Sequence, residues 1–389
     1  MSKLTIAIVG LGGAVGTTMA AGLELLRLGK ATKVGLPLAA FENCGLIPYE
    51  EIEVCGWDIV ADDLHTACIR HSVLPLEQIT IAADYLKKIS PLPAPVNSNY
   101  SPLQNGNNIL HSTLAELSKT IRNNIRDFSN RTGQLVVLNL ASTERINSYA
   151  PDDLKSPEVF EAAITENSAA ISPAMLFAYA AIKEGVPYAN FTPSIAADLE
   201  ALKLLAAVNN VPIAGKDGKT GQTFLKTVIA PALRDRALHV DGWYSTNILG
   251  NRDGLALSDE NALQSKLKTK ESVLDEILGY HVEDHIVDIR YYRPRGDNKE
   301  AWDNIDITGF LGQPMQIKVN FLCRDSILAA PLAIEVARCL ALAASQKISG
   351  VVEELSVFFK SPMFRSRPVT NDFFLQQKLF MDWLAQADK

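Results

Sequence analysis

The sequence predicts an α/β fold in which a parallel sheet with flanking helices precedes a second unit built mainly from longer strands. Three observations support this prediction. An apolar run at Leu4–Gly10 leads through a glycine-rich turn into a helix rich in Ala and Leu, as at the start of a βαβ unit. Strand and helix patterns then alternate to about residue 195. Beyond that point, several strand-like runs follow one another.

The elements of the first unit differ in composition. Leu4–Gly10 is short, apolar and β-branched, which is typical of a parallel strand buried on both faces. The helix after it ends before Gly29, where glycine often follows a helix. Gln134–Ser142 predicts a second buried strand. Helices are expected around 157–167 and 173–184.

The remaining segments predict an irregular excursion and a second sheet. Ser90–Asn108 is dense in Pro, Asn and Ser, and predicts a crossing arm or a lid rather than a regular element. A helix is expected at Ala196–Val208 and another at Ser326–Ser345. Three long runs with strand character lie between them, at 238–249, 285–294 and 312–323. Such a succession predicts an antiparallel or mixed sheet.

Length and composition indicate a globular chain of two domains. A chain of 389 residues exceeds the length at which one core normally keeps growing. Its 47% hydrophobic and 21% charged residues are typical of globular proteins. The net charge of −7 argues against general nucleic-acid binding. The five cysteines are scattered and form no C-x-x-C pair, which suits a reducing compartment and offers no zinc-finger ligand set.

The sequence gives no indication of a membrane partner. The N-terminal run lacks the basic region and apolar core of a leader, and no segment reaches the roughly 18 uncharged apolar residues of a span. The most apolar segment, 330–345, carries Glu335 and Arg338, and predicts a buried helix with a polar edge. We therefore expect a cytoplasmic protein.

The turn GLGGAVG predicts dinucleotide binding. It follows G-x-G-x-x-x-G rather than G-x-G-x-x-G, because Val15 stands at the third glycine position. The glycines still allow a tight turn, and a helix N-terminus offers N–H groups to a pyrophosphate. Lys33 stands about 20 residues on, where an acid usually binds ribose, and Asp58 is the candidate substitute. A purely structural turn is the less favoured alternative.

The stretch GKDGKTGQTFLKT resembles the end of a P-loop but does not match the motif. Ile213 stands where the opening glycine of the motif belongs. Thr220 and the next three residues begin an expected helix that continues through Arg236, which makes a possible monophosphate site with hydroxyl and amide side chains. A plain helix cap is the alternative.

Charged residues downstream suggest a basic pocket. Lys360 is set among apolar neighbours, which would lower its pKa and make it chemically useful, whereas Lys268 suits a solvated face. His281 and His285 have the spacing of a helical metal pair, but the region predicts a strand and H-E-x-x-H is not matched, so no metal site is expected.

Five separated motifs, in this order and spacing, resemble the inositol-3-phosphate synthases (myo-inositol-1-phosphate synthases). They are GKDGKTGQTFLKT, YSTNILGNRDGLALSD, SKLKTKESV, YYRPRGDNKEAWD and CRDSILAAPLAIE. The likeness runs from the glycine loop to FFKSP, and the length resembles the compact prokaryotic form. It implies an NAD-binding Rossmann domain at 1–195 and 315–389, with an inserted α+β catalytic and tetramerisation domain at 196–314.

The resemblance also implies a reaction. D-Glucose 6-phosphate would become 1D-myo-inositol 3-phosphate by oxidation at C5, enolisation, intramolecular aldol closure and re-reduction. NAD is then a recycled cofactor, and the product begins inositol and inositol-phospholipid biosynthesis. The expected assembly is a homotetramer.

The matched motifs assign three groups of residues. The catalytic group is Lys266, Lys270, Lys299, Lys360, Asp217, Asp253 and Asp325. The phosphate-binding group is Thr220, Gly221, Gln222, Thr223 and Asn251. The NAD-binding group is Gly10, Gly12, Gly13, Ala14, Val15, Gly16, Asp58, Ala141, Ser142 and Thr143. Lys266 is expected to move the proton at C5 and Lys360 to stabilise the enolate.

Two alternatives and two departures accompany this assignment. A sugar-phosphate dehydrogenase would stop after oxidation and release NADH, and a regulatory protein would have lost the Lys and Asp set, which is complete here. Ala14-Val15 and Ser142 stand where Asn is common in the family, and both positions lie on the cofactor side.

Overall fold

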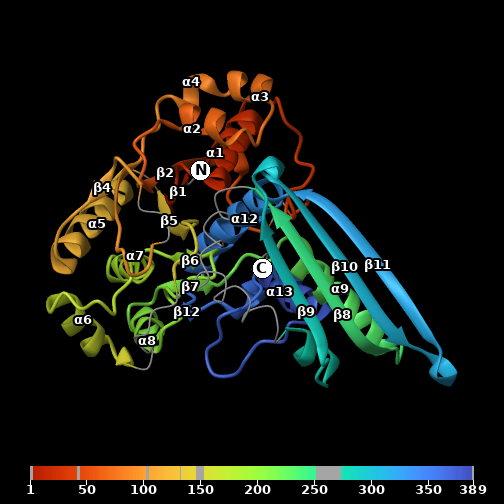
Figure 1. Ribbon diagram of the computed structural model, residues 1–389. Coiled ribbons are helices and arrows are strands. Elements are labelled where there is room, and N and C mark those ends of the chain that lie inside the picture. The colour runs from red at the N-terminus through yellow and green to blue at the C-terminus, as the bar shows by residue number, and fades with distance from the viewer. Residues whose placement is uncertain are drawn as a thin grey trace.

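The computed structural model describes residues 3–41, 44–101, 105–131, 133–145, 153–250 and 273–387, and its ribbon is drawn in Figure 1. Four residues of the expected site, Asn251, Asp253, Lys266 and Lys270, lie outside the described residues, as does Lys268.

An eight-stranded parallel sheet forms the larger part of the molecule. Its strands are β1 (Leu4–Val9), β2 (Ile52–Asp58), β3 (Leu92–Pro95), β4 (Ile109–Leu110), β5 (Gln134–Asn139), β6 (Tyr188–Asn190), β7 (Pro212–Gly215) and β12 (Gly350–Val351). They lie in the order β12-β7-β6-β5-β1-β2-β3-β4. The six central strands have the order of a dinucleotide-binding fold, in which successive strands are added on one side of β1 and then on the other. This confirms the predicted α/β fold.

Helices cover both faces of the large sheet, because the side chains of β1 alternate between two cores. Leu4, Ile6 and Ile8 pack on one face with α1 (Ala14–Arg27) and α12 (Asp325–Ser345). Ala7 and Val9 pack on the other face. The helices there are α5 (Leu114–Ser129), α6 (Pro157–Thr165), α7 (Pro173–Lys183) and α8 (Glu200–Val208).

Local sequence explains where several of these helices begin. Thr113 starts α5 with a capping box to Glu116, and Ser156 and Ser172 cap α6 and α7 just before a proline. Other helices are α2 (Leu64–His71), α3 (Leu76–Ile81), α4 (Ala83–Leu86), α13 (Phe373–Ala387) and the 3₁₀ turns η1 (Tyr49–Glu51), η3 (Arg293–Arg295), η4 (Phe310–Gly312) and η5 (Glu353–Phe358).

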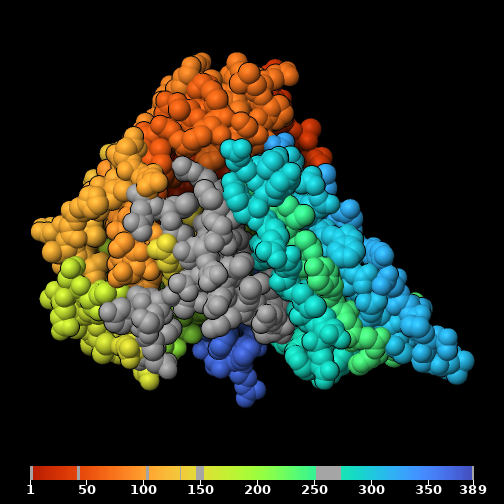
Figure 2. All heavy atoms as spheres, viewed as in Figure 1, coloured from red at the N-terminus to blue at the C-terminus, as the bar shows by residue number. Residues whose placement is uncertain are grey.

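A smaller mixed sheet forms one flank of the molecule (Figures 1 and 2). Its strands are β8 (His239–Leu249), β9 (Asp284–Tyr291), β10 (Asn298–Thr308) and β11 (Pro314–Arg324), in the order β11-β10-β8-β9. The β8–β9 pair is parallel and the other two pairs are antiparallel. Helix α9 (Gly221–Asp235) packs on one face with Ala230 and Leu233 against Trp243 and Ile305. The predicted second sheet is confirmed.

Helix α12 joins the two sheets and is buried. It starts where β11 ends and runs back across the large sheet (Figure 1). In length and composition it is the one helix of the described ranges that could cross a membrane, but 72% of its apolar window is buried inside the molecule. Its polar edge is also internal, because Glu335 pairs with Arg338 at 2.6 Å and accepts a hydrogen bond from Tyr49.

The structure differs from the sequence prediction in a few bounds. Strand β10 was not predicted, and β3 lies inside the stretch expected to be irregular. Helix α8 begins at Glu200, four residues later than expected. Strand β7 belongs to the large sheet and β11 to the small one, so the change between sheets falls after Gly215 and after Arg324. The domain limits at 195 and 314 stay a prediction.

Candidate active site

One cavity of about 260 Å³ lies at the carboxyl ends of the large-sheet strands and reaches the start of β10 and α12. In open α/β sheets, ligands bind at this edge, where the strand order reverses. Residues expected on separate grounds meet in its lining: Gly10, Gly13, Ala14, Val15, Asp58, Ala141, Ser142, Thr143, Asp217, Thr220, Lys299, Asp325 and Lys360. The cavity therefore joins the expected cofactor residues to the expected catalytic residues.

The glycine turn provides a close approach to the start of α1. Gly10 has φ +86°, and a Cβ there would lie 3.0 Å from the backbone of Ala141. A Cβ at Gly16 would lie 2.5 Å from the carbonyl oxygen of Leu11. The first N–H groups of a helix have no partner within it, and the first turn of α1 carries no acidic side chain. The turn therefore suits the pyrophosphate of a dinucleotide.

Asp58 ends β2 beside this turn. Its Oδ2 accepts the Gly12 N–H at 2.9 Å, and its Oδ1 accepts the Val60 N–H at 3.0 Å. The usual spacing to the ribose-binding acid fails here, because a long connection follows α1 and β2 begins only at Ile52. Asp58 nevertheless takes the place of that acid at the end of the second strand.

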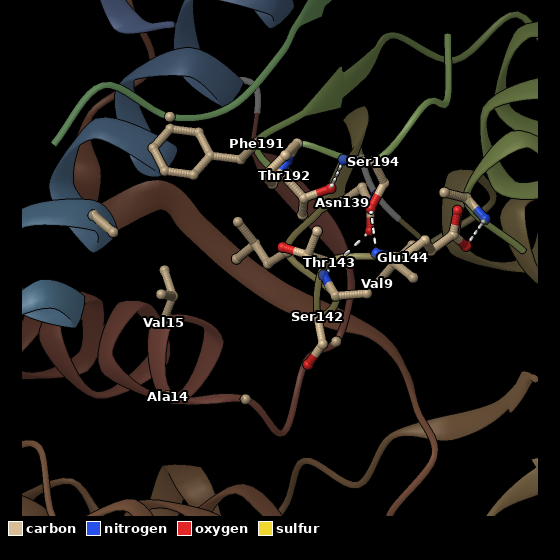
Figure 3. Close-up of a pocket in the computed structure, with 18 of the residues that line it drawn as sticks. Val9, Ala14, Val15, Asn139, Ser142, Thr143, Glu144, Phe191, Thr192 and Ser194 are labelled. Atoms are coloured by element: carbon tan, nitrogen blue, oxygen red, sulfur yellow. Dashed lines mark hydrogen bonds between the residues drawn. The ribbon is translucent and has the colours of Figure 1, made fainter. Parts of the chain in front are cut away.

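Side chains at the ends of β5 and β6 fix another wall of the cavity. Asn139 Nδ2 donates to Asn190 Oδ1 at 3.1 Å, and Asn190 Nδ2 donates to the Ser194 carbonyl at 2.7 Å. Ser194 Oγ accepts the Glu144 N–H at 2.9 Å. Figure 3 shows this wall, with Ser142 and Ala14 beside the same open space. The network holds the segment that carries Ala141, Ser142 and Thr143.

Glu144 brings a carboxyl group to the same wall. Its Oε1 accepts the Ala174 N–H at 3.0 Å, at the start of α7. Burial raises the pKa of this carboxyl to about 7, and the hydrogen bond from Ala174 opposes the shift. Glu144 and the two asparagines were not predicted from the sequence. Their one sequence signal is that each lies at or just after the end of a buried strand.

Two lysine–aspartate pairs also line the cavity. Lys360 Nζ lies 2.7 Å from Asp217 Oδ1, and Lys299 Nζ lies 3.2 Å from Asp325 Oδ1. Lys360, Asp217 and Lys299 are all at least 90% buried. Lys360 has the apolar neighbours that the sequence predicted, but its ammonium group is also paired with a carboxylate.

Backbone hydrogen bonds fix the first pair. The Lys360 N–H donates to the Asp217 carbonyl at 2.7 Å, the Lys219 N–H to the Phe358 carbonyl at 2.7 Å, and the Met363 N–H to the Gly215 carbonyl at 2.7 Å. Two segments far apart in the sequence thus run side by side and present Asp217 opposite Lys360.

The expected phosphate site is the first turn of α9. Thr220 is its N-cap residue and lines the cavity, while Gly221, Gln222 and Thr223 are buried in the first turn. A Cβ at Gly221 would lie 3.9 Å from Lys299 Nζ, so this turn lies beside the Lys299–Asp325 pair. Gln222 is not among the residues that line the cavity, and its side chain donates to Asp303 Oδ2 at 3.0 Å.

The structure separates the two histidines that suggested a metal pair. His281 is exposed beside Asp275, whereas His285 lies on β9 with its Nε2 2.6 Å from Lys226 Nζ. Within the described ranges, no group of three or more His, Cys, Asp or Glu side chains could hold a metal ion.

Comparisons with known proteins indicate the family of this chain. A family model described as myo-inositol-1-phosphate synthase matches residues 40–385. Inositol-3-phosphate synthase 1 of Bacteroides thetaiotaomicron is 40% identical over 402 residues, which cover 97% of this chain and 94% of that protein. The Dictyostelium discoideum inositol-3-phosphate synthase is 33% identical, over 86% of this chain and 73% of that protein.

Solved structures give the same result. Inositol-3-phosphate synthase of Caenorhabditis elegans superposes with a TM-score of 0.93 at 25% identity, covering 100% of this chain and 86% of that chain. A myo-inositol-1-phosphate synthase-related protein of Thermotoga maritima, at 23% identity and a TM-score of 0.82, shares the fold over 98% of both chains. The chain belongs to the myo-inositol-1-phosphate synthase family.

Proposed function

We propose that the chain is an inositol-3-phosphate synthase, an isomerase that converts D-glucose 6-phosphate to 1D-myo-inositol 3-phosphate with recycled NAD. The observation that supports this most directly is the shared cavity. The glycine turn of a dinucleotide site and two Lys–Asp pairs with buried lysines line the same space of about 260 Å³. A hydride donor bound by the lysines would therefore lie next to the cofactor.

The residues present fit NAD. A Cβ at Gly16 would collide with the glycine turn, so the turn requires glycine there. The start of α1 offers free N–H groups to a pyrophosphate, and Asp58 at the end of β2 offers a carboxylate to a ribose. We assign the pyrophosphate to Gly10–Gly16, a ribose to Asp58, and the far end of the cofactor to Ala141, Ser142 and Thr143. When bound, NAD accepts a hydride from the substrate and later returns it, so the overall reaction is an isomerisation.

The lysines stabilise negative charge on the substrate. Deprotonation of the C5 hydroxyl as the hydride leaves, enolisation and ring closure each place negative charge on an oxygen atom. Ammonium groups fixed in a cavity stabilise such charge without reorganising. Asp217 and Asp325 hold Lys360 and Lys299 in place. We assign the enolate to Lys360, and we place Lys266 and Lys270 with this set, with Lys266 moving the C5 proton.

The first turn of α9 is the proposed phosphate site. Its N–H groups and the Thr220 and Thr223 hydroxyls can donate to a phosphate, and the helix dipole favours an anion there. Because Lys299 lies beside Gly221, a phosphate bound here places the sugar chain toward the Lys–Asp pairs. Asn251 and Asp253 complete the proposed substrate site.

The test is product analysis with excess glucose 6-phosphate and a small amount of NAD. Each NAD molecule must then be used many times for product to accumulate. We expect inositol phosphate to accumulate in large excess over NAD, without accumulation of NADH. Lys360→Ala should lower kcat by about 10²-fold or more, the size of effect seen when one fixed charge-stabilising donor is lost. Lys266→Ala is expected to lower kcat as well.

Lys378→Ala is the control, because Lys378 is exposed on α13 and pairs only with Asp382 among the described residues. Near-normal turnover in Lys360→Ala would contradict the role of Lys360. NADH formed in proportion to substrate, with no inositol phosphate, would instead identify the alternative dehydrogenase.

We further propose a cytoplasmic homotetramer that supplies inositol for phospholipid synthesis. Exposed apolar side chains on the face of the small sheet opposite α9 support subunit contact: Tyr244 (38%), Ile286 (49%) and Leu322 (61%). All five cysteines are free thiols, which suits a reducing compartment.

A further inference from the structure

The side chain of Gln222 belongs to a buried hydrogen-bond chain behind the phosphate site. Its Nε2 donates to Asp303 Oδ2 at 3.0 Å, and its Oε1 accepts from Asn247 Nδ2. Trp243 Nε1 and Ser245 Oγ donate to the other oxygen of Asp303, at 2.8 and 2.7 Å. All five side chains are at least 97% buried.

Asp303 sets the polarity of this chain. A carboxylate only accepts hydrogen bonds, so Gln222 must turn its N–H₂ toward Asp303 and its oxygen toward Asn247. Asn247 Oδ1 has no partner within the described residues, so the Gln222 contact is what orients that amide. Both ends of the Gln222 amide are thereby used by the protein, and the side chain does not line the cavity.

Strand β10 carries both Asp303 and Lys299 on the face toward α9. The two residues are four apart, or about 13 Å along an extended strand. Lys299 lies beside Gly221, and Asp303 binds the next residue, Gln222. One strand therefore holds the first turn of α9 at one point and a substrate-facing ammonium group at another.

A second contact fixes α9 one turn further on. Lys226 is 97% buried, with its Nζ 2.6 Å from His285 Nε2 and 5.5 Å from the centre of the Trp243 ring. Burial lowers the pKa of this amine to about 8, and the charge of Asp303 opposes the shift. Gln222 and Lys226 are i and i+4, so one side of the helix is bound to the sheet.

We propose that Asp303, acting through Gln222, is a positioning residue that fixes the phosphate site relative to Lys299. The backbone N–H groups of α9 bind the phosphate, and the Gln222 side chain sets where that turn lies. The role rests on the proposed function, since it matters when a phosphate anchors a sugar whose far end must meet the lysines.

The test separates positioning from direct phosphate binding. Gln222→Met keeps the length of the side chain and removes its hydrogen bonds, and Asp303→Ala removes the acceptor. We expect each variant to lower kcat about tenfold or more, while the Kd of inorganic phosphate, measured by calorimetry, changes less than threefold. The double variant should be no slower than the slower single variant, because both act through one contact.

Asp235→Asn, an exposed change at the far end of α9, is the control and should match the wild type. A tenfold weaker phosphate Kd with unchanged kcat in Gln222→Met would overturn the proposal and show that this side chain binds phosphate directly. Unchanged kcat and Kd in Gln222→Met would overturn it as well. If Asp303→Ala does not fold, Gln222→Met alone decides.

The phosphate titration does not depend on turnover. If the wild-type chain made no inositol phosphate, the proposed function would fail, yet the titration would still show whether the Gln222 side chain contributes to phosphate binding.

Discussion

Glu144 is a partly buried acid in the cavity wall that the proposed chemistry does not use. Its carboxyl lies at the N-terminus of α7 and has a pKa of about 7 because burial penalises the charged form. In an unfolded chain the same carboxyl has its ordinary pKa of 4.5. The folded chain therefore keeps a proton that the unfolded chain loses between these two values.

This difference makes stability depend on pH. The contribution of Glu144 is fully present below about pH 4.5 and is lost as the pH rises to about 7. Glu144→Gln keeps an acceptor for the Ala174 N–H and removes the titration. We expect its free energy of unfolding, measured with denaturant without cofactor, to fall less between pH 5 and pH 8 than that of the wild type. Equal slopes would contradict the assignment.

Other residues show what the sequence could and could not reveal. The Lys and Asp motifs identified Asp217, Lys299, Asp325 and Lys360, and the structure brings them to one cavity. Motif reading also grouped Gln222 with its neighbours as phosphate-binding. A linear motif cannot show where a side chain points, and the partner of Gln222 lies 81 residues away on β10.

At the scale of elements, the strand–turn–helix at the N-terminus was predictable because its composition and its glycines agree. Leu4–Val9 is buried throughout, and α1 starts at the glycine turn. Strand β10 was not predictable, because the buried Asp303 interrupts the apolar alternation that indicates a strand. The long connection before β2 moves the acid away from its usual spacing, yet the sequence still indicated Asp58 as the substitute.

Helix α1 offers a matched pair of glycines. A Cβ at Gly16 would lie 2.5 Å from the Leu11 carbonyl oxygen, whereas a Cβ at Gly22 meets nothing within 4 Å. We expect Gly16→Ala to displace the turn and weaken NAD binding at least tenfold, as measured by calorimetry. Gly22→Ala should leave NAD affinity unchanged and stabilise the fold by about 0.5–1 kcal/mol, because alanine is the better helix former.

Equal NAD affinity in the wild type and Gly16→Ala would show that the turn does not hold the pyrophosphate. A large loss in Gly22→Ala would show that α1 itself, rather than the close approach of the turn, limits binding.

At the scale of the whole molecule, the site depends on segments from both ends of the chain. The 215–219 segment pairs with the 358–363 segment, and α12 returns from the small sheet to pack under β1 and β5. The alternation of strands and helices predicted the fold class. It could not predict these contacts, because contacts between segments far apart in the sequence produce no periodic pattern in the sequence of either segment.

The outer face of the small sheet predicts the assembly. Tyr244, Ile286 and Leu322 are exposed on the side away from α9, where Tyr244 also contacts Trp302 edge to face. We expect Ile286→Lys combined with Leu322→Lys to dissociate the proposed tetramer, since two buried ammonium groups per subunit would lack partners in the contact. Sedimentation velocity measures the change in mass.

Val208→Lys is the control, because Val208 is 75% exposed at the end of α8, a helix that packs on the large sheet. It should leave the mass unchanged, and all variants should keep the wild-type circular dichroism because the altered side chains are exposed in the single chain. A tetramer that survives both lysines would place the subunit contact elsewhere. A wild-type chain that sediments as a monomer would refute the assembly itself.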